Sequence, residues 1–287
     1  MKRRRFTWKA IFLFIFIAPC IYDALRAQPR VYADSAFAPS LATMKKYVII
    51  MPDRYSPSRR YPILYLLHGW GGACQDWTAK TDIKKHVDDV PIITVMPDAE
   101  NSWYVDSYSD STARFESYLM NDLPKTVQEK YSVDTTKQAI AGLSMGGYGA
   151  LALGLRHPKK FKFIGSLSGL ITVPRDIDAR TDLPAMKTLL LSLEKAFGDT
   201  DNSFRAEHDP FVIYKNTPSP SLPYIYLVVG VRDGYPASIP RHHEFSDLLR
   251  AYGAEYEYHE PPGEHNWQFW DKEIQGVLKR MRRVMRF

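Results

Sequence analysis

Short, uninterrupted apolar runs recur along this chain and alternate with longer segments that are apolar on one face only. Continuous runs of four to nine apolar residues are typical of strands buried on both faces of a parallel sheet. By this criterion strands are expected at residues 47–51, 61–67, 91–96, 138–141, 161–168 and 222–230, and a last strand with alternating aromatic residues at 255–259.

Segments with helical periodicity lie between these runs. Apolar residues recur every four positions from Phe115 to Tyr131, which predicts a helix over 111–131 with a kink at Pro124. Further helices are expected at 148–157, 183–197, 240–252 and 274–287. Because strands alternate with helices, we predict an α/β fold with a mostly parallel central sheet and helices on both faces.

One connection between predicted strands is much longer than the others and covers residues 169–221, after the sixth strand if a leading strand within 28–44 is counted first. Connections of this length usually carry their own helices or a function. We therefore expect an insertion that lies over the carboxyl ends of the strands and is a candidate lid.

The net charge of +6 is concentrated at the amino terminus, where residues 1–27 contain six basic residues and one acidic residue. The remainder carries only +1, so the charge does not indicate a nucleic-acid surface. A twelve-residue apolar run, 10–21, is shorter than a membrane span needs. Residues 1–27 therefore predict a signal peptide and a secreted or periplasmic protein, with residues 28–287 as one domain. An uncleaved membrane anchor and lipidation at Cys20 are the alternatives.

The segment Gly142-Leu143-Ser144-Met145-Gly146-Gly147 stands between a predicted strand and a predicted helix. Strand, G-x-S-x-G and helix together indicate a nucleophile elbow, in which a sharp turn exposes the serine Oγ. The strand and the helix nearly touch there, so positions 142 and 146 must lack a side chain. The N–H of Met145 would lie at a helix N-terminus and could stabilise an oxyanion.

A serine nucleophile needs a base to accept its proton and an acid to orient that base. His265 follows the last predicted strand and is the candidate base, and Asp233 follows the preceding strand and is the candidate acid. Asp233 precedes a glycine, a pair that also forms ordinary turns, so Asp209 in the insertion is the alternative acid. The chain order Ser144, Asp233, His265 is that of α/β-hydrolases.

Two other loops are candidates for the same site. The glycine-rich loop 68–72 follows an early strand, and the backbone N–H of Trp70 is its candidate oxyanion donor, with the His68 side chain bracing the loop. Trp103 and Tyr104 are candidates for stacking a sugar or a phenolic ring, with ordinary loop packing as the alternative. His243-Glu244 lacks the second histidine of a H-E-x-x-H zinc motif, so we expect no metal and no cofactor.

Taken together, these motifs resemble the putative-esterase family of α/β-hydrolases. The resemblance rests on Leu-Leu-His-Gly-Trp-Gly-Gly-x-x-x-x-Trp at 66–77, the serine motif, the Asp233 loop and Gly-x-His-x-Trp at 263–267, and covers roughly residues 44–280. This family includes S-formylglutathione hydrolase, feruloyl and acetyl-xylan esterases and the antigen 85 mycolyltransferases. The resemblance implies the α/β-hydrolase fold and carboxylic-ester chemistry, and its matching positions here are the triad Ser144, Asp233 and His265 and the oxyanion donors Trp70 and Met145.

The function expected from these observations is an exported serine esterase that forms an acyl-enzyme on Ser144. Its partner would be a small-molecule or polysaccharide-linked ester, with feruloyl and acetyl groups as candidates. An acyltransferase with the same triad, passing the acyl group to a sugar hydroxyl, and a non-catalytic carbohydrate-binding relative are the alternatives. No nucleic-acid partner is expected, and the membrane would be reached only through a retained amino-terminal segment.

Overall fold

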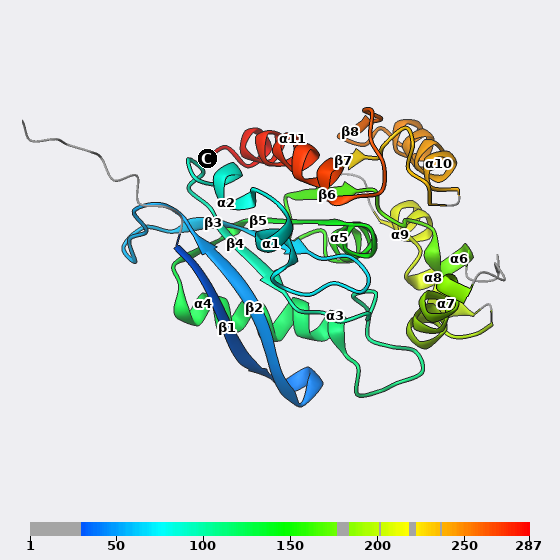
Figure 1. Cartoon of the computed structure of the whole chain (residues 1–287), viewed down its shortest axis with the longest axis horizontal. Coiled ribbons are helices and arrows are strands. Elements are labelled where there is room, and N and C mark those ends of the chain that lie inside the picture. The colour runs from blue at the N-terminus through cyan, green and yellow to red at the C-terminus, as the bar shows by residue number, and fades with distance from the viewer. Residues whose placement is uncertain (1–29, 177–183, 201, 218–221, 236) are drawn as a thin grey trace, which may run out of the picture.

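The central sheet of the computed structural model runs through the whole molecule (Figure 1). The structure describes residues 30–176, 184–200, 202–217, 222–235 and 237–287. Within these ranges eight strands form one sheet in the order β1-β2-β4-β3-β5-β6-β7-β8. Their bounds are β1 Arg30–Ala38, β2 Thr43–Met51, β3 Tyr61–Leu67, β4 Ile93–Pro97, β5 Val133–Leu143, β6 Phe163–Leu167, β7 Tyr224–Val228 and β8 Tyr256–His259.

The prediction of a mostly parallel sheet is confirmed. Strands β4, β3, β5, β6, β7 and β8 are parallel to one another. β2 pairs antiparallel with β4, and β1 pairs antiparallel with β2 at that edge. Every residue of β3, β4 and β6 is buried, which is why these strands appear as continuous apolar runs.

Helices cover both faces of the sheet, as predicted. One face packs on α4 (Leu123–Lys130), α5 (Met145–Arg156), α9 (Pro210–Asn216) and α10 (Ser238–Ala251). The other face packs on α1 (Asp76–Lys80), α2 (Ile83–His86) and α11 (Trp267–Met285). In Figure 1, α11 and α4 accordingly lie on opposite sides of the strands.

The long connection after β6 lies at one end of the molecule (Figure 1). Its described parts form α6 (Val173–Asp176), α7 (Pro184–Phe197), α8 (Ser203–Glu207) and α9. The predicted helix at 183–197 corresponds to α7. In the ranges given above, no helix is both long and apolar enough to cross a bilayer. The predicted signal peptide, residues 1–27, lies outside them.

Two predicted helices differ from the structure. The segment 111–131 becomes helical only at α3 (Phe115–Ser117), continues as a π-helical turn over Tyr118–Asp122 and then becomes α4, with Pro124 in the first turn of α4. Pro124 has no N–H to donate to Met120 O in the preceding turn, and that oxygen accepts from Lys160 Nζ instead. The last helix begins at Trp267 instead of 274, because the Asn266 side chain accepts a hydrogen bond from the Phe269 N–H and caps it.

Candidate active site

Ser144 occupies the sharp turn between β5 and α5. Its backbone has φ +53° and ψ −118°, a conformation that a non-glycine residue adopts only under strain. A Cβ atom on Gly142 would lie 2.4 Å from the carbonyl oxygen of Gly146, and one on Gly146 would lie 2.5 Å from that of His68. The strand β5 and the helix α5 therefore touch at Gly142, as the steric argument from the sequence requires, whereas Gly146 touches the end of the neighbouring strand β3.

The side chains of Ser144, His265 and Asp233 form one hydrogen-bonded chain. The Nε2 atom of His265 lies 2.9 Å from Ser144 Oγ, and its Nδ1 atom lies 2.9 Å from Asp233 Oδ2. The three residues follow β5, β8 and β7, so the carboxyl ends of parallel strands bring them together. The Asp233 side chain is fully buried, whereas 22% of the His265 side-chain surface is exposed.

The environment of Asp233 selects one tautomer of His265. Burial raises the pKa of Asp233, but the hydrogen bond and the charge of His265 outweigh burial, and the net pKa lies below its ordinary value. The Tyr235 backbone N–H also donates to Oδ1. An ionised carboxylate can only accept, so the proton of neutral His265 lies on Nδ1. Nε2 is then free to accept the Ser144 proton, which is the arrangement a general base needs.

The alternative acid, Asp209, is used elsewhere. Its Oδ2 atom accepts a hydrogen bond from Arg175 Nε at 2.6 Å, and its Oδ1 atom caps α9 by accepting from the Phe211 N–H at 2.8 Å. Asp233 is thus the carboxylate that contacts His265. In the part of the chain that the structure describes, no three His, Cys, Asp or Glu side chains are arranged to hold a metal ion.

The glycine-rich loop after β3 lies beside the serine, since a Cβ on Gly69 would lie 3.5 Å from Ser144 Cβ. Buried His68 orients this loop. Its Nε2 accepts the Ala99 N–H at 3.0 Å, so Nδ1 carries the proton and donates to Gly69 O at 2.8 Å. Burial lowers the pKa of His68, which preserves the neutral form that these two bonds require. The expected bracing role of His68 fits these contacts.

The peptide between Gly69 and Trp70 is held by its carbonyl. Gly69 O accepts from His68 Nδ1 and, at 3.1 Å, from the Gly72 N–H. The C=O and N–H of a trans peptide point in opposite directions, so the Trp70 N–H points away from these two donors. Across the described ranges, neither the Trp70 N–H nor the Met145 N–H has a hydrogen-bond acceptor. Both are thus available to a ligand, as an oxyanion hole requires.

The expectation that Trp103 and Tyr104 stack a substrate ring is wrong. Both side chains are completely buried, so neither presents a face to a ligand. Trp103 Nε1 donates to Ser192 Oγ at 2.9 Å, and the Tyr104 hydroxyl donates to His68 O at 2.7 Å. Ordinary packing, the alternative weighed from the sequence, is what the structure has.

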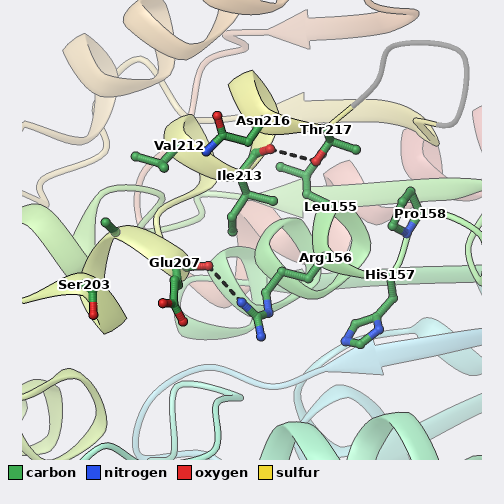
Figure 2. Close-up of a pocket in the computed structure, with 11 residues that line it drawn as sticks. Leu155, Arg156, His157, Pro158, Ser203, Glu207, Val212, Ile213, Asn216 and Thr217 are labelled. Carbon is green, nitrogen blue, oxygen red and sulfur yellow. Dashed lines mark hydrogen bonds between the residues drawn. The ribbon is translucent and has the colours of Figure 1, made fainter.

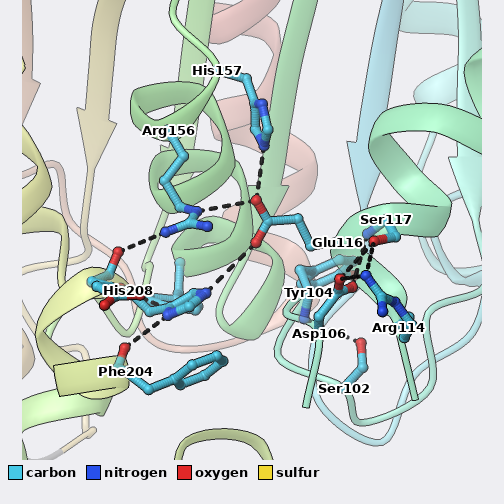
Figure 3. A network of polar contacts seen from close by, with 12 residues as sticks. Ser102, Tyr104, Asp106, Arg114, Glu116, Ser117, Arg156, His157, Phe204 and His208 are labelled. Atoms are coloured by element: carbon cyan, nitrogen blue, oxygen red, sulfur yellow. Dashed lines mark hydrogen bonds and ion pairs between the residues drawn. The ribbon is translucent and has the colours of Figure 1, made fainter. Parts of the chain in front are cut away.

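A second polar cluster, which sequence reasoning missed, lies around buried Glu116 (Figure 3). Its Oε1 accepts from Arg156 Nε at 3.0 Å and lies 2.8 Å from His157 Nε2, and its Oε2 lies 3.6 Å from His208 Nε2. Burial raises the pKa of Glu116, but the contacts with His157, His208 and Arg156 outweigh burial and hold the net pKa well below its ordinary range. This cluster joins α3 and α5 to the insertion.

A hollow of about 700 Å³ adjoins that cluster, between the end of α5 and helices α8 and α9 (Figure 2). Arg156 Nη1 donates to Glu207 O across it. Ser144 precedes the first residue of the 12-residue helix α5. The hollow is at the other end of that helix, about 18 Å away at 1.5 Å per residue, so it is separate from the Ser144 site.

With this geometry in place, comparison with known proteins identifies the family. The profile of the putative esterase family matches residues 39–281. The chain belongs to the putative esterase family. The resemblance drawn from the motifs is therefore confirmed, and the chain is a carboxylic ester hydrolase with the α/β-hydrolase fold.

Individual members of the putative esterase family match to different extents. The chain is 27% identical to an acetyl esterase of Caldicellulosiruptor saccharolyticus over 231 residues, which are 79% of this chain and 85% of that protein. It is 35% identical to the diacylglycerol acyltransferase/mycolyltransferase Ag85A of Mycobacterium leprae over 122 residues, or 38% of this chain and 36% of that protein. A solved ferulic acid esterase superposes with a TM-score of 0.74 at 24% identity, covering 90% of this chain and 99% of that one.

Proposed function

We propose that this protein is an exported serine esterase that uses Ser144, His265 and Asp233 to remove feruloyl or acetyl groups from polysaccharide. The observation that carries the catalytic part is the hydrogen-bonded chain from Asp233 through His265 to Ser144, with both distances 2.9 Å. The serine at its end lies on the strained turn of the elbow.

In the proposed reaction, His265 Nε2 takes the Ser144 proton as Oγ attacks the ester carbonyl carbon. The carbonyl oxygen becomes an oxyanion that accepts from the backbone N–H groups of Trp70 and Met145. When the oxyanion collapses, the C–O bond to the alcohol breaks and His265 returns the proton to the departing oxygen. Water then attacks the acyl-enzyme and gives one proton to His265. The bond between the acyl carbon and Ser144 Oγ breaks, His265 returns that proton to Oγ, and the carboxylic acid leaves. Asp233 stays ionised and stabilises the imidazolium in both steps.

The substrate and export parts of the proposal have separate support. One similar protein is named an acetyl esterase and one similar structure a ferulic acid esterase, which favours acetyl and feruloyl as the acyl groups. The basic and apolar residues 1–27 favour export, and export places the enzyme where plant polysaccharide is found. Because Trp103 and Tyr104 are buried, they do not support the sugar or phenolic part of this proposal.

A second candidate is acyl transfer by the same residues. It is favoured by the 35% identity with an acyltransferase, although that match spans 38% of this chain. In this reading a sugar hydroxyl replaces water as the acceptor. Product analysis with and without an added sugar distinguishes the two, since only the transferase forms a new sugar ester.

The experiment that tests the catalytic assignment uses purified Ser144→Ala and Asp233→Asn, with methyl ferulate, p-nitrophenyl acetate and acetylated xylan as substrates. Ser144→Ala should fold normally and lose a factor on the order of 10⁶ in kcat, because the nucleophile is gone. Asp233→Asn should lose about 10⁴ in kcat, because the amide favours the wrong His265 tautomer.

A fluorophosphonate probe provides the control, since it should label wild type and not Ser144→Ala. Activity of Ser144→Ala within tenfold of wild type, in protein free of other esterases, would overturn the assignment of the nucleophile. A near-normal rate for Asp233→Asn would show that another carboxylate orients His265.

A further inference from the structure

We propose that Ser192, on helix α7 of the insertion, is a positioning residue that holds the Trp70 loop in place for oxyanion stabilisation. This inference rests on the proposed function, because it assumes that the Trp70 N–H stabilises the transition state. It assigns the insertion a role in catalysis as a fixed support of the oxyanion loop.

The hydroxyl of Ser192 uses its full hydrogen-bonding capacity. Its Oγ accepts from Trp70 Nε1 at 3.0 Å and from Trp103 Nε1 at 2.9 Å, and it donates to Leu189 O at 2.6 Å. A hydroxyl has one donor and two acceptor lone pairs. All three are occupied, so the group is oriented completely and joins two indoles from separate loops to one helix.

Trp70 is the residue through which this contact reaches the site. Its loop lies beside Ser144, and the peptides on both sides of Trp70 are held by other groups. His68 Nδ1 donates to Gly69 O at 2.8 Å, and Asn101 Oδ1 accepts from the Gly71 N–H at 2.6 Å. Those anchors come from the loops after β3 and β4. The anchor of the Trp70 side chain comes from α7.

Helix α7 is held in position by contacts other than those of Ser192. Near its end, Ala196 O accepts from the Tyr108 N–H at 2.9 Å and Lys195 O accepts from Ser107 Oγ at 2.6 Å. Lys195 also forms an ion pair with Asp110 at 2.9 Å. Loss of the Ser192 hydroxyl should therefore release the indole N–H of Trp70, together with that of buried Trp103, and leave the helix where it is.

The expected consequence is a loss of kcat with little change in KM. Oxyanion donors act on charge that develops in the transition state, so misplacing one slows chemistry without weakening substrate binding. Ser192→Ala should lower kcat on p-nitrophenyl acetate by about 10- to 100-fold, the range expected for a donor displaced by up to about 1 Å. KM should stay within about twofold of wild type.

The experiment compares Ser192→Ala, Trp70→Phe, the double variant and Thr188→Ala by kcat, KM and melting temperature. Trp70→Phe keeps the backbone N–H and an aromatic ring but removes the indole and its Nε1 donor, so it should reproduce the kcat loss. Because both changes break the hydrogen bond between Trp70 Nε1 and Ser192 Oγ, the double variant should be little worse than Ser192→Ala alone. Thr188 is exposed one turn earlier on α7, and Thr188→Ala should match wild type.

A wild-type kcat for Ser192→Ala, a loss confined to KM, or losses that multiply in the double variant would each overturn the proposal. If Ser192→Ala does not fold, Trp70→Phe carries the same test, and a wild-type kcat there overturns it. Failure of the proposed function would be distinguished by Ser144→Ala, which would then retain activity.

Discussion

Gly146→Ala tests whether the close contact between the first turn of α5 and the end of β3 is what places the Ser144 hydroxyl. The added Cβ would lie 2.5 Å from His68 O and 2.7 Å from Leu67 O, whereas ordinary contacts begin at 3.4 Å. The first turn of α5 must therefore move about 0.9 Å away from the end of β3. Both obstacles are main-chain atoms, so no side chain can rotate to make room.

The expected losses of stability and of rate follow from that displacement. Overpacking of this kind costs about 1–3 kcal/mol, which a domain with about 5–15 kcal/mol of stability survives. Ser144 directly precedes α5, so the movement also displaces Oγ and the Met145 N–H. A misplacement of about 1 Å costs about 10²-fold in rate. We therefore expect a folded protein whose kcat/KM is lower by about two orders of magnitude.

The assay is kcat/KM on p-nitrophenyl acetate together with a thermal melt. Gly234→Ala is the matched control, because a Cβ on Gly234 would meet nothing within 4 Å. A folded Gly146→Ala with kcat/KM within about twofold of wild type would refute the reasoning from the displacement. Equal losses in both variants would show that the site responds to any added methyl group.

Two further predictions concern Glu116 and the amino terminus. Folding lowers the pKa of Glu116. Its contribution to the free energy of unfolding is therefore complete above the unfolded-state pKa of about 4.3 and is lost as the pH falls from there toward the folded-state pKa. Measured by urea titration, Glu116→Gln should lower the free energy of unfolding by about 2–4 kcal/mol at pH 7, and by about 1–2 kcal/mol less than that at pH 3. Glu129 is exposed, so Glu129→Gln should cost little at either pH. Equal costs of Glu116→Gln at both pH values would contradict this. Mass spectrometry of protein from the native host should find residues 1–27 removed, and an intact amino terminus in soluble cytoplasmic protein would exclude export.

Features that depend on neighbouring residues could be predicted from the sequence. The elbow needs a strand, a helix and glycines at 142 and 146, and all of these lie within one short segment. The parallel strands have continuous apolar runs because they are buried on both faces. Ser144, Asp233 and His265 each follow a predicted strand, so the sequence leaves open only whether Asp233 or Asp209 is the acid that orients His265. The start of α11 at Trp267 also has a local signal, because Asn266 is a preferred N-cap residue.

Contacts between distant segments were decided by the tertiary structure alone. Trp103 and Ser192 are 89 residues apart, and Trp70 and Ser192 are 122 apart, yet one hydroxyl joins all three. The pattern around Trp103 is that of a polar loop, which predicts exposure, whereas the packing of α7 buries the ring. Hydrophobic periodicity reports which face of an element is buried and not what covers it. The covering partner is set by how the strands are ordered and where the insertion folds back, and no local pattern records either.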